Sequence, residues 1–160
     1  MQTFRDTTGR VWTISVDVSA IKRVRALLNV DLLEAVEDKL LCRLSTDPIL
    51  LCDVVYALCK PDADTAGVSD EDFGRAMSGD ALDEATTGLL QELVDFFPLG
   101  KRRLLAKALE KFKVFEEKAL VAADLKLDSP EMEAELESVL SGIGSSSGEP
   151  LEPSASTPAP

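Results

Sequence analysis

Alternating apolar and polar positions open the chain, and helical spacing takes over after residue 16. Residues 3–16, TFRDTTGRVWTISV, predict a small β-hairpin because two short runs flank a Thr-Thr-Gly turn at residues 7–9. The second run alternates so that one face carries Trp12, Ile14 and Val16. We therefore expect the hairpin to pack against the rest of the chain by that face.

Helical spacing predicts three helices over the next fifty residues. The first follows a cap at Asp17 or Ser19 and stops at Asn29, a residue that tolerates the left-handed conformation. The second, LLEAVEDKLLCRL, begins after Asp31, and the third begins with Asp47 as N-cap and Pro48 at the first helical position. The side chains expected to face inward are Ile21, Val24, Leu27 and Leu28, then Leu33, Val36, Leu40 and Leu44, then Leu51, Val54, Val55 and Leu58.

Residues 61–77, PDADTAGVSDEDFGRAM, raise the question of a calcium loop. An EF-hand needs oxygen ligands at positions one, three and five, a glycine at six and a bidentate glutamate at twelve. Here positions one, three and six match, but positions five and twelve supply no ligand. The residues at these five positions are Asp62, Asp64 and Gly67, which match, and Ala66 and Phe73, which do not. We therefore expect no calcium site.

The same acidic segment is better explained as a loop followed by a helix start. Ser69 and Asp72 have the spacing of a capping box, and Asp70 and Glu71 suit the positive end of a helix dipole. After a break at residues 78–80, further helices are predicted from about 81 to 97, from 101 to 125, and from Ser129-Pro130 to 140. The prediction is a mainly α domain, 1–141, a helical bundle with an N-terminal hairpin. Residues 142–160, rich in Ser and Pro, predict a disordered tail.

The two long helices have unusually wide apolar faces. At about 100° per residue, each spreads its apolar side chains over roughly half its circumference, whereas packing on one neighbour needs only about 100°. Either these helices are central in the bundle, or they offer surplus apolar surface to a helix of another protein. The candidates for a partner-binding surface are Phe96, Phe97, Leu104, Leu105, Phe112 and Phe115.

A basic ridge follows one side of the second long helix. It consists of Arg103, Lys107, Lys111 and Lys118, which lie within about 80° of one another around the helix. The ridge is a solvated face, or it pairs with the acidic segment before it. A nucleic-acid role is disfavoured, because 29 acidic residues against 17 basic ones give a net charge of −12 and a pI near 4.4.

Composition removes most catalytic chemistry. Histidine is absent, which excludes the usual triads and mixed Cys/His zinc sites. Cys42, Cys52 and Cys59 are spaced like core residues of helices. We expect them to be buried, unpaired thiols in a reducing cytoplasm. There is no phosphate loop, nucleophile elbow or metal signature, and no apolar run near the ~20 residues of a membrane helix. We expect a cytoplasmic, non-enzymatic protein without a cofactor or metal.

Three stretches occur in a fixed order before a basic amphipathic helix: GRVWTISVDVSAIKRVR, DPILLCDVVYALCKPDADTAGVSDEDFGRAM and LLQELVDFFP. Together they resemble tail assembly chaperone-like proteins of tailed phages and prophages. The resemblance covers about residues 3–125 and rests on order, length and hydrophobic layout, with SDEDF and DFFP as its most distinctive pieces. It implies a small cytoplasmic helical protein that binds the tape measure protein, and it leaves tail tube subunits open as further clients.

Two other classes of function stay open at this stage. A structural tail or head–tail joining subunit would have the same helical composition and would form rings by itself. A nucleic-acid-associated regulator would use the basic ridge between residues 103 and 118. The sequence does not specify the client or the oligomeric state.

Overall fold

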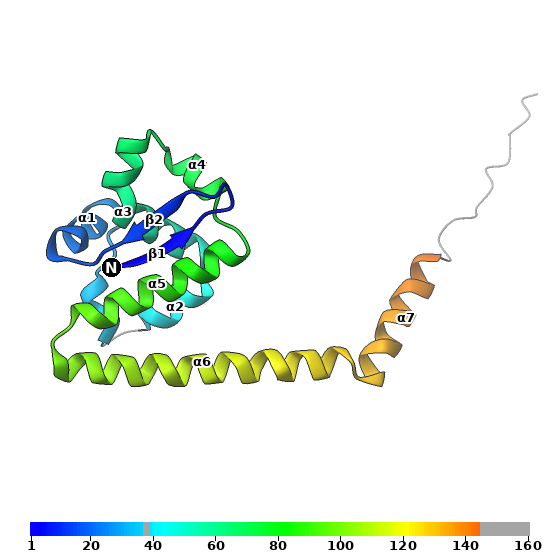
Figure 1. The fold of residues 1–160 in the computed structure, drawn as a ribbon. Helices are drawn as coiled ribbons and strands as arrows, with labels where there is room; N and C mark the ends of the chain where they lie inside the picture. The colour runs from blue at the N-terminus through cyan, green and yellow to red at the C-terminus, as the bar shows by residue number, and fades with distance from the viewer. Residues whose placement is uncertain (37–38, 145–160) are drawn as a thin grey trace, which may run out of the picture. The chain divides into compact units, whose positions relative to one another are not determined.

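The computed structural model describes residues 1–36 and 39–144. It divides into two compact units, Met1–Val114 and Phe115–Pro160. The described residues form seven α-helices, one short 3₁₀ helix and one two-stranded hairpin, which confirms the mainly α fold with an N-terminal hairpin (Figure 1). None of the described helices is both long and apolar enough to cross a membrane. The extent of the expected domain, 1–141, stays a prediction.

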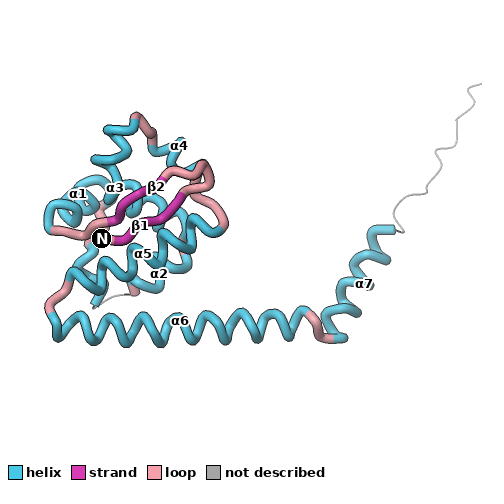
Figure 2. The backbone as a smooth tube through the Cα atoms, viewed as in Figure 1, coloured by secondary structure: helices cyan, strands magenta, loops and turns pink. Residues whose placement is uncertain are grey.

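The hairpin consists of β1 (Gln2–Arg5) and β2 (Val11–Ile14), which pair antiparallel with Phe4 opposite Trp12. Helix α5 (Asp80–Phe96) packs along β1, and α3 (Pro48–Ala66) packs against β2, so one face of the hairpin is covered by helices (Figure 2). Trp12 and Ile14 are buried on that face, as the alternation predicts, and Val16 is half-buried against the core. Phe4, opposite Trp12, is buried with them. The hairpin turn is tied to the end of α4 (Asp70–Arg75), because the backbone N–H and hydroxyl of Thr7 both donate to the Ala76 carbonyl.

Helix α1 (Val18–Leu28) is capped at its start by Asp17, one of the two predicted caps, and at its end by Asn29, as predicted. The Asp17 carboxylate accepts a hydrogen bond from the Ala20 backbone, and Asn29 has φ 54°, in the left-handed region. Ile21 and Val24 are buried, and Leu28 packs at the edge of the core. Leu27 was also expected inside, but it is 53% exposed because it lies on the outer flank of the stripe.

The second predicted helix is not continuous. It consists of a 3₁₀ turn, η1 (Leu32–Val36), and a short helix, α2 (Leu40–Thr46). A 3₁₀ turn has three residues per turn, so Leu32 and Ala35 point into the core. The prediction of an inward Leu33 is therefore wrong, since this side chain is 42% exposed. Leu40 and Leu44 are buried as expected, and the side chain of Val36 lies outside the described residues.

Helix α3 (Pro48–Ala66) is the long helix that α1 packs against. Asp47 caps it as predicted, accepting hydrogen bonds from the backbones of Ile49 and Leu50. The predicted buried set of this helix, Leu51, Val54, Val55 and Leu58, is confirmed.

The prediction of a loop beginning at Pro61 is wrong, because α3 continues through this proline to Ala66. Proline removes one helical hydrogen bond, but the continuing turn buries Ala63 completely. Asp62 and Asp64 therefore lie on a helix and not in a calcium-type loop. Gly67 ends the helix with φ 65°, a left-handed conformation that glycine adopts without strain.

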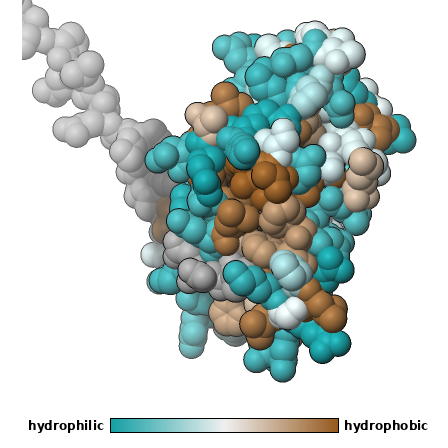
Figure 3. Space-filling view, turned by 90° about the vertical axis from the view of Figure 1, so that its left-hand side faces the viewer, coloured by the Kyte–Doolittle hydropathy of each residue, from teal (hydrophilic) through white to brown (hydrophobic). Residues whose placement is uncertain are grey.

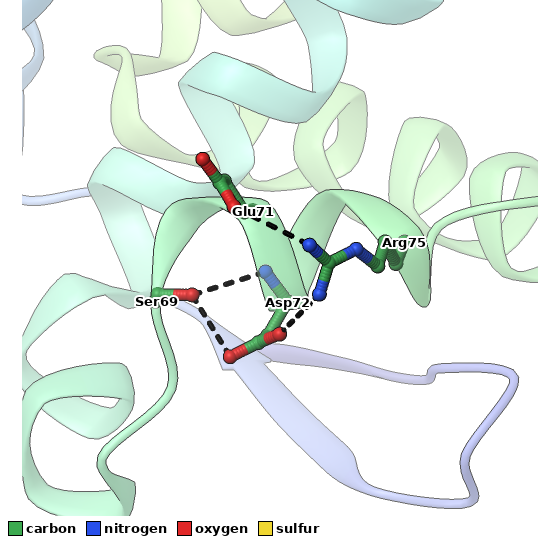
Figure 4. A network of polar contacts seen from close by, with 4 residues as sticks. All are labelled: Ser69, Glu71, Asp72 and Arg75. Carbon is green, nitrogen blue, oxygen red and sulfur yellow. Dashed lines mark hydrogen bonds and ion pairs between the residues drawn. The ribbon is translucent and has the colours of Figure 1, made fainter.

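Helix α4 (Asp70–Arg75) starts at the predicted cap, Ser69. The Ser69 hydroxyl accepts a hydrogen bond from the Asp72 backbone N–H at 3.1 Å and donates to the Asp72 carboxylate at 2.9 Å (Figure 4). Arg75 at the other end of the helix pairs with Asp72 and Glu71. Phe73 of the same helix is buried in the core, where the centroid of its ring lies 5.0 Å from that of Trp12.

Helix α5 (Asp80–Phe96) packs against β1, β2, α2 and α3. Ala85, Leu89 and Leu93 are fully buried on its apolar face, and Leu82 and Phe96 are half-buried at the edge of the core. Its last carbonyls, those of Asp95 and Phe97, accept hydrogen bonds from the Arg102 guanidinium. Arg102 thereby fixes the turn into the next helix by satisfying groups that the helix end leaves open.

Helix α6 (Leu99–Leu127) runs from the first unit into the second, where α7 (Pro130–Gly144) follows it. Ser129 begins α7 as predicted, with its hydroxyl accepting from the Met132 backbone. The predicted disordered tail lies outside the described residues from residue 145 on.

Candidate functional site: an apolar groove

A groove with a volume of about 440 Å³ lies on the first unit, between η1 and α2 on one side and the first half of α6 on the other. We call it the α2–α6 groove. Its lining is mostly apolar, with one lysine and one serine. The lining residues are Ala35, Lys39, Leu41, Cys42, Ser45, Leu104, Leu105, Ala108, Leu109 and Phe112.

Helix α6 builds its wall of the groove from a repeat of apolar positions. Leu105 and Leu109, four residues apart, are the buried residues of this helix and rest on the core. Leu104 and Ala108, which directly precede Leu105 and Leu109, are exposed, and Phe112 is half-buried. The floor of the groove is therefore core, and its rim is exposed apolar surface.

Helix α2 builds the opposite wall from its outer face. Leu40 and Leu44 turn into the core, which leaves Leu41, Cys42 and Ser45 on the groove side. The sequence prediction missed these three residues. The sequence does contain a sign of this wall. Leu41 and Cys42 follow the buried Leu40 directly and cannot lie on the same face of the helix.

The six predicted partner-binding residues fall into three places. Leu104, Leu105 and Phe112 come together in the α2–α6 groove. Phe97 is buried and Phe96 half-buried, with ring centroids 5.4 Å apart in an edge-to-face contact at the core. Phe115 belongs to the second unit, where it is 70% exposed. The structure thus brings half of the predicted set together.

The two wide apolar faces have different explanations. Most of the apolar face of α5 is covered, because four elements, β1, β2, α2 and α3, pack against this helix. The face of α6 is not covered within the first unit, where only Leu105 and Leu109 are buried. The surplus apolar surface that the sequence allowed for is therefore found on α6 alone.

The basic ridge is exposed along its whole length. Its members Arg103, Lys107 and Lys111 belong to the first unit and Lys118 to the second, and none forms an ion pair within the described residues. At about 100° per residue, Lys111 and Lys107 lie roughly 20° and 60° around α6 from Leu104. The ridge therefore adjoins the rim of the groove.

The α6 wall is strongly positive for so acidic a chain. Residues 99–114 contain six basic residues and one acidic residue, a net charge of +5, whereas the whole chain has −12. Arg102 is held by backbone carbonyls, and the Lys101 ammonium lies 6.0 Å from the centre of the Phe97 ring. The remaining basic residues of this wall are free to meet an anionic partner.

A second hollow, of about 340 Å³, includes Cys52, Asp53 and Asp70. Burial raises the pKa of the Cys52 thiol to about 11, and the carboxylates of Asp53 and Asp70 add to this rise. The thiolate is therefore disfavoured at neutral pH, and the hollow does not supply an activated nucleophile. Within the described residues, no group of three or more cysteine, aspartate or glutamate side chains is placed to hold a metal ion.

Apolar residues also gather on the face of the molecule shown in Figure 3, on the side of α1 and of the turn between α5 and α6. Brown residues form a continuous patch there, and teal residues surround it. Apolar surface that is gathered in this way is typical of a site for another macromolecule.

No protein-family model, no curated protein and no solved structure matches the chain. The functional argument therefore depends on the groove and its surroundings.

Proposed function

We propose that the chain is a non-enzymatic tail assembly chaperone, which binds a helix of the tape measure protein in the α2–α6 groove and acts in the host cytoplasm. The observation that carries this proposal is an open apolar groove of about 440 Å³ with an exposed leucine on its rim. The resemblance of residues 3–125 to such chaperones agrees with it.

The groove has the chemistry of a helix-binding site. An amphipathic helix that enters such a groove buries its own apolar stripe together with the exposed rim, and each large side chain buried contributes about 1.5–3 kcal/mol. Leu104, Ala108 and Phe112 are spaced by four residues, so they follow the groove in one row.

The net charge of the chain supports the other task of a chaperone, which is to keep the bound client soluble. A tape measure protein is long and prone to aggregate when its apolar helices are exposed. A bound chain that carries a charge of −12 adds like-charge repulsion between complexes, which keeps them dispersed. The positive wall is confined to α6, so this repulsion acts over most of the surface.

Co-expression tests the proposal directly. A helical fragment of the tape measure protein from the same genome is expressed with the chain, and the soluble fraction of the fragment is measured. We expect the wild-type chain to keep the fragment soluble and to co-purify with it. Leu104→Asp places a charge on the groove rim, and we expect it to remain folded and to lose at least about tenfold in affinity.

A matched control lies on the same helix. Leu99 is exposed to a similar extent, 63% against 65% for Leu104, but does not line the groove. Leu99→Asp should therefore retain the client. If Leu104→Asp binds the fragment as well as the wild type does, the groove is not the client site. Rings of the isolated chain in native mass spectrometry would instead favour a structural tail subunit.

A further inference from the structure

Helix α7 is an amphipathic helix whose apolar stripe has no cover within its own unit. Leu136, Val139 and Leu140 are 55–69% exposed, and together with the half-buried Met132 they span about 100° of the helix. Their spacing of i, i+4, i+7 and i+8 is that of the anchors of a helix that lies in a groove. The stripe therefore has the form of a ligand for a helix-binding site.

The charge of α7 is entirely negative. Residues 130–144 contain four glutamates and no basic residue, a net charge of −4, and all four glutamates are exposed. Glu133 and Glu135 lie on the two borders of the apolar stripe, at roughly 20° and 40° beyond its edges. A helix of this kind fits an apolar groove with a basic border.

The α2–α6 groove has those properties. Its rim is apolar, and its α6 wall has a net charge of +5 with Lys107 and Lys111 beside Leu104. Helix α7 and the α2–α6 groove are thus complementary in two ways, since an apolar stripe can meet an apolar rim and an acidic border can meet a basic one. Opposite charges at such borders fix the register and speed the encounter.

We propose that the α2–α6 groove binds helix α7 of a second copy of the chain. In a two-fold dimer each copy gives its α7 and receives that of its partner, so the same contact is made twice and the assembly closes. This inference rests on the proposed function in that it assigns the same groove, and it makes self-association a competitor of client binding. The chain would then be stored as a dimer whose grooves are filled until a client displaces α7.

The average mass of the full chain in solution tests the proposal. Light scattering coupled to gel filtration, over a dilution series from low micromolar to millimolar, should show the mass rising from 17.3 kDa for one chain towards twice that value. Leu136→Asp and Leu104→Asp, one on each side of the contact, should each weaken the association by about tenfold or more. Leu99→Asp is the control and should leave it unchanged.

Charge reversal gives the sharper test. We expect Glu133→Lys with Glu135→Lys to weaken the dimer, and Lys107→Glu with Lys111→Glu to weaken it as well. An equimolar mixture of the two double variants should restore association, because the lysines of one chain then meet the glutamates of the other. Restoration in the mixture, absent from either variant alone, identifies a contact between copies.

The outcomes also separate this inference from the proposed function. A full chain that stays monomeric at every concentration, or a mixture of double variants that fails to associate, overturns the binding of α7. A dimer that Leu104→Asp does not weaken overturns it too, because the interface then lies elsewhere. Co-purification of the tape measure fragment is measured in parallel with the Glu133→Lys, Glu135→Lys variant, which leaves the groove intact, so client binding can persist when self-association fails.

Discussion

Leu104 and Leu105 are adjacent in the sequence and have opposite surroundings, since 65% of the Leu104 side chain is exposed and only 3% of Leu105. Both line the α2–α6 groove, Leu104 at its rim and Leu105 at its floor. Neighbouring helical residues point about 100° apart, so one turn of α6 serves the core and the groove together. Binding and folding can therefore be separated by substitutions at neighbouring positions.

The first prediction concerns the stability of this pair. Leu105→Ala removes a buried side chain from the core and should lower the free energy of unfolding by about 2–4 kcal/mol. Leu104→Ala removes only exposed surface and should change it by less than about 0.5 kcal/mol. Urea unfolding followed by the fluorescence of Trp12 measures both. Equal losses for the two variants would show that α6 is not seated as described.

The second prediction uses Cys42 as a reporter of the groove. Cys42 is exposed and lines the groove, whereas burial raises the pKa of the Cys59 thiol to about 12 and that of Cys52 to about 11. At a dilution where the chain is monomeric and its groove is empty, one thiol of the folded protein should therefore react rapidly with a maleimide at pH 7.5, and Cys42→Ser should abolish that fast phase. A bulky maleimide on Cys42 should then exclude a helix from the groove.

Two further measurements control this labelling experiment. A bound tape measure fragment should slow the reaction of Cys42, and unfolding in urea should bring all three thiols to similar rates. Fast reaction of Cys52 or Cys59 in the folded protein would contradict their burial. Unchanged client binding after complete labelling of Cys42 would place the client away from the groove.

Local sequence chemistry was enough to predict most of the first unit. Asp47 before Pro48, Asn29 after an apolar stripe and Ser69 before acidic residues each act over three or four residues, and the structure confirms all three. The prediction that Leu33 faces inward was wrong because it assumed α-helical spacing, and a 3₁₀ turn has a different spacing. The prediction of a loop at Pro61 was wrong because a proline costs a helix one hydrogen bond but does not end it, and α3 continues to Ala66 with Ala63 buried.

The groove could be predicted only in part. The wide apolar faces of α5 and α6 look alike in the sequence, and which of them is covered depends on tertiary packing. The second wall comes from Leu41, Cys42 and Ser45, about sixty residues before α6, and no local pattern links the two. Cys42 was expected in the core because of its helical spacing, and the structure shows it exposed.

The third prediction concerns an unfavourable carboxylate. Burial raises the pKa of Asp53 above its ordinary value of 3.8, and the negative charges of Asp70 and Asp47 raise it further. The charged form is therefore penalised in the folded state at neutral pH, and the penalty disappears as the pH falls through the raised pKa. Because solvent screens this partly exposed carboxylate, Asp53→Asn should increase the free energy of unfolding at pH 7 by no more than about 0.5 kcal/mol, with no gain at pH 3. Thermal unfolding at the two pH values measures this difference.

The last prediction concerns Asp6, whose buried carboxylate organises the hairpin turn. Its Oδ1 accepts hydrogen bonds from the backbone and hydroxyl of Thr8 and from the Arg10 backbone, and its Oδ2 accepts one of 2.8 Å from the Trp12 indole. Burial by itself raises the pKa of Asp6, but the four hydrogen bonds outweigh it and hold the pKa below its ordinary value of 3.8. The charged form is thus favoured by folding.

The sign of the pH dependence follows from this lowered pKa. The stabilisation is complete above the unfolded pKa, near 3.8, and is lost as the pH falls from there through the folded pKa. Asp6→Asn should lower the free energy of unfolding by about 2–3 kcal/mol at pH 7, because an amide presents hydrogens to groups that donate. The gap between wild type and variant should stay constant down to about pH 5 and shrink below 3.8. Asp62→Asn, at an exposed carboxylate on α3, is the control and should change stability by less than about 0.5 kcal/mol. A gap that persists undiminished at pH 2 would show that Asp6 acts through its shape and not through its charge.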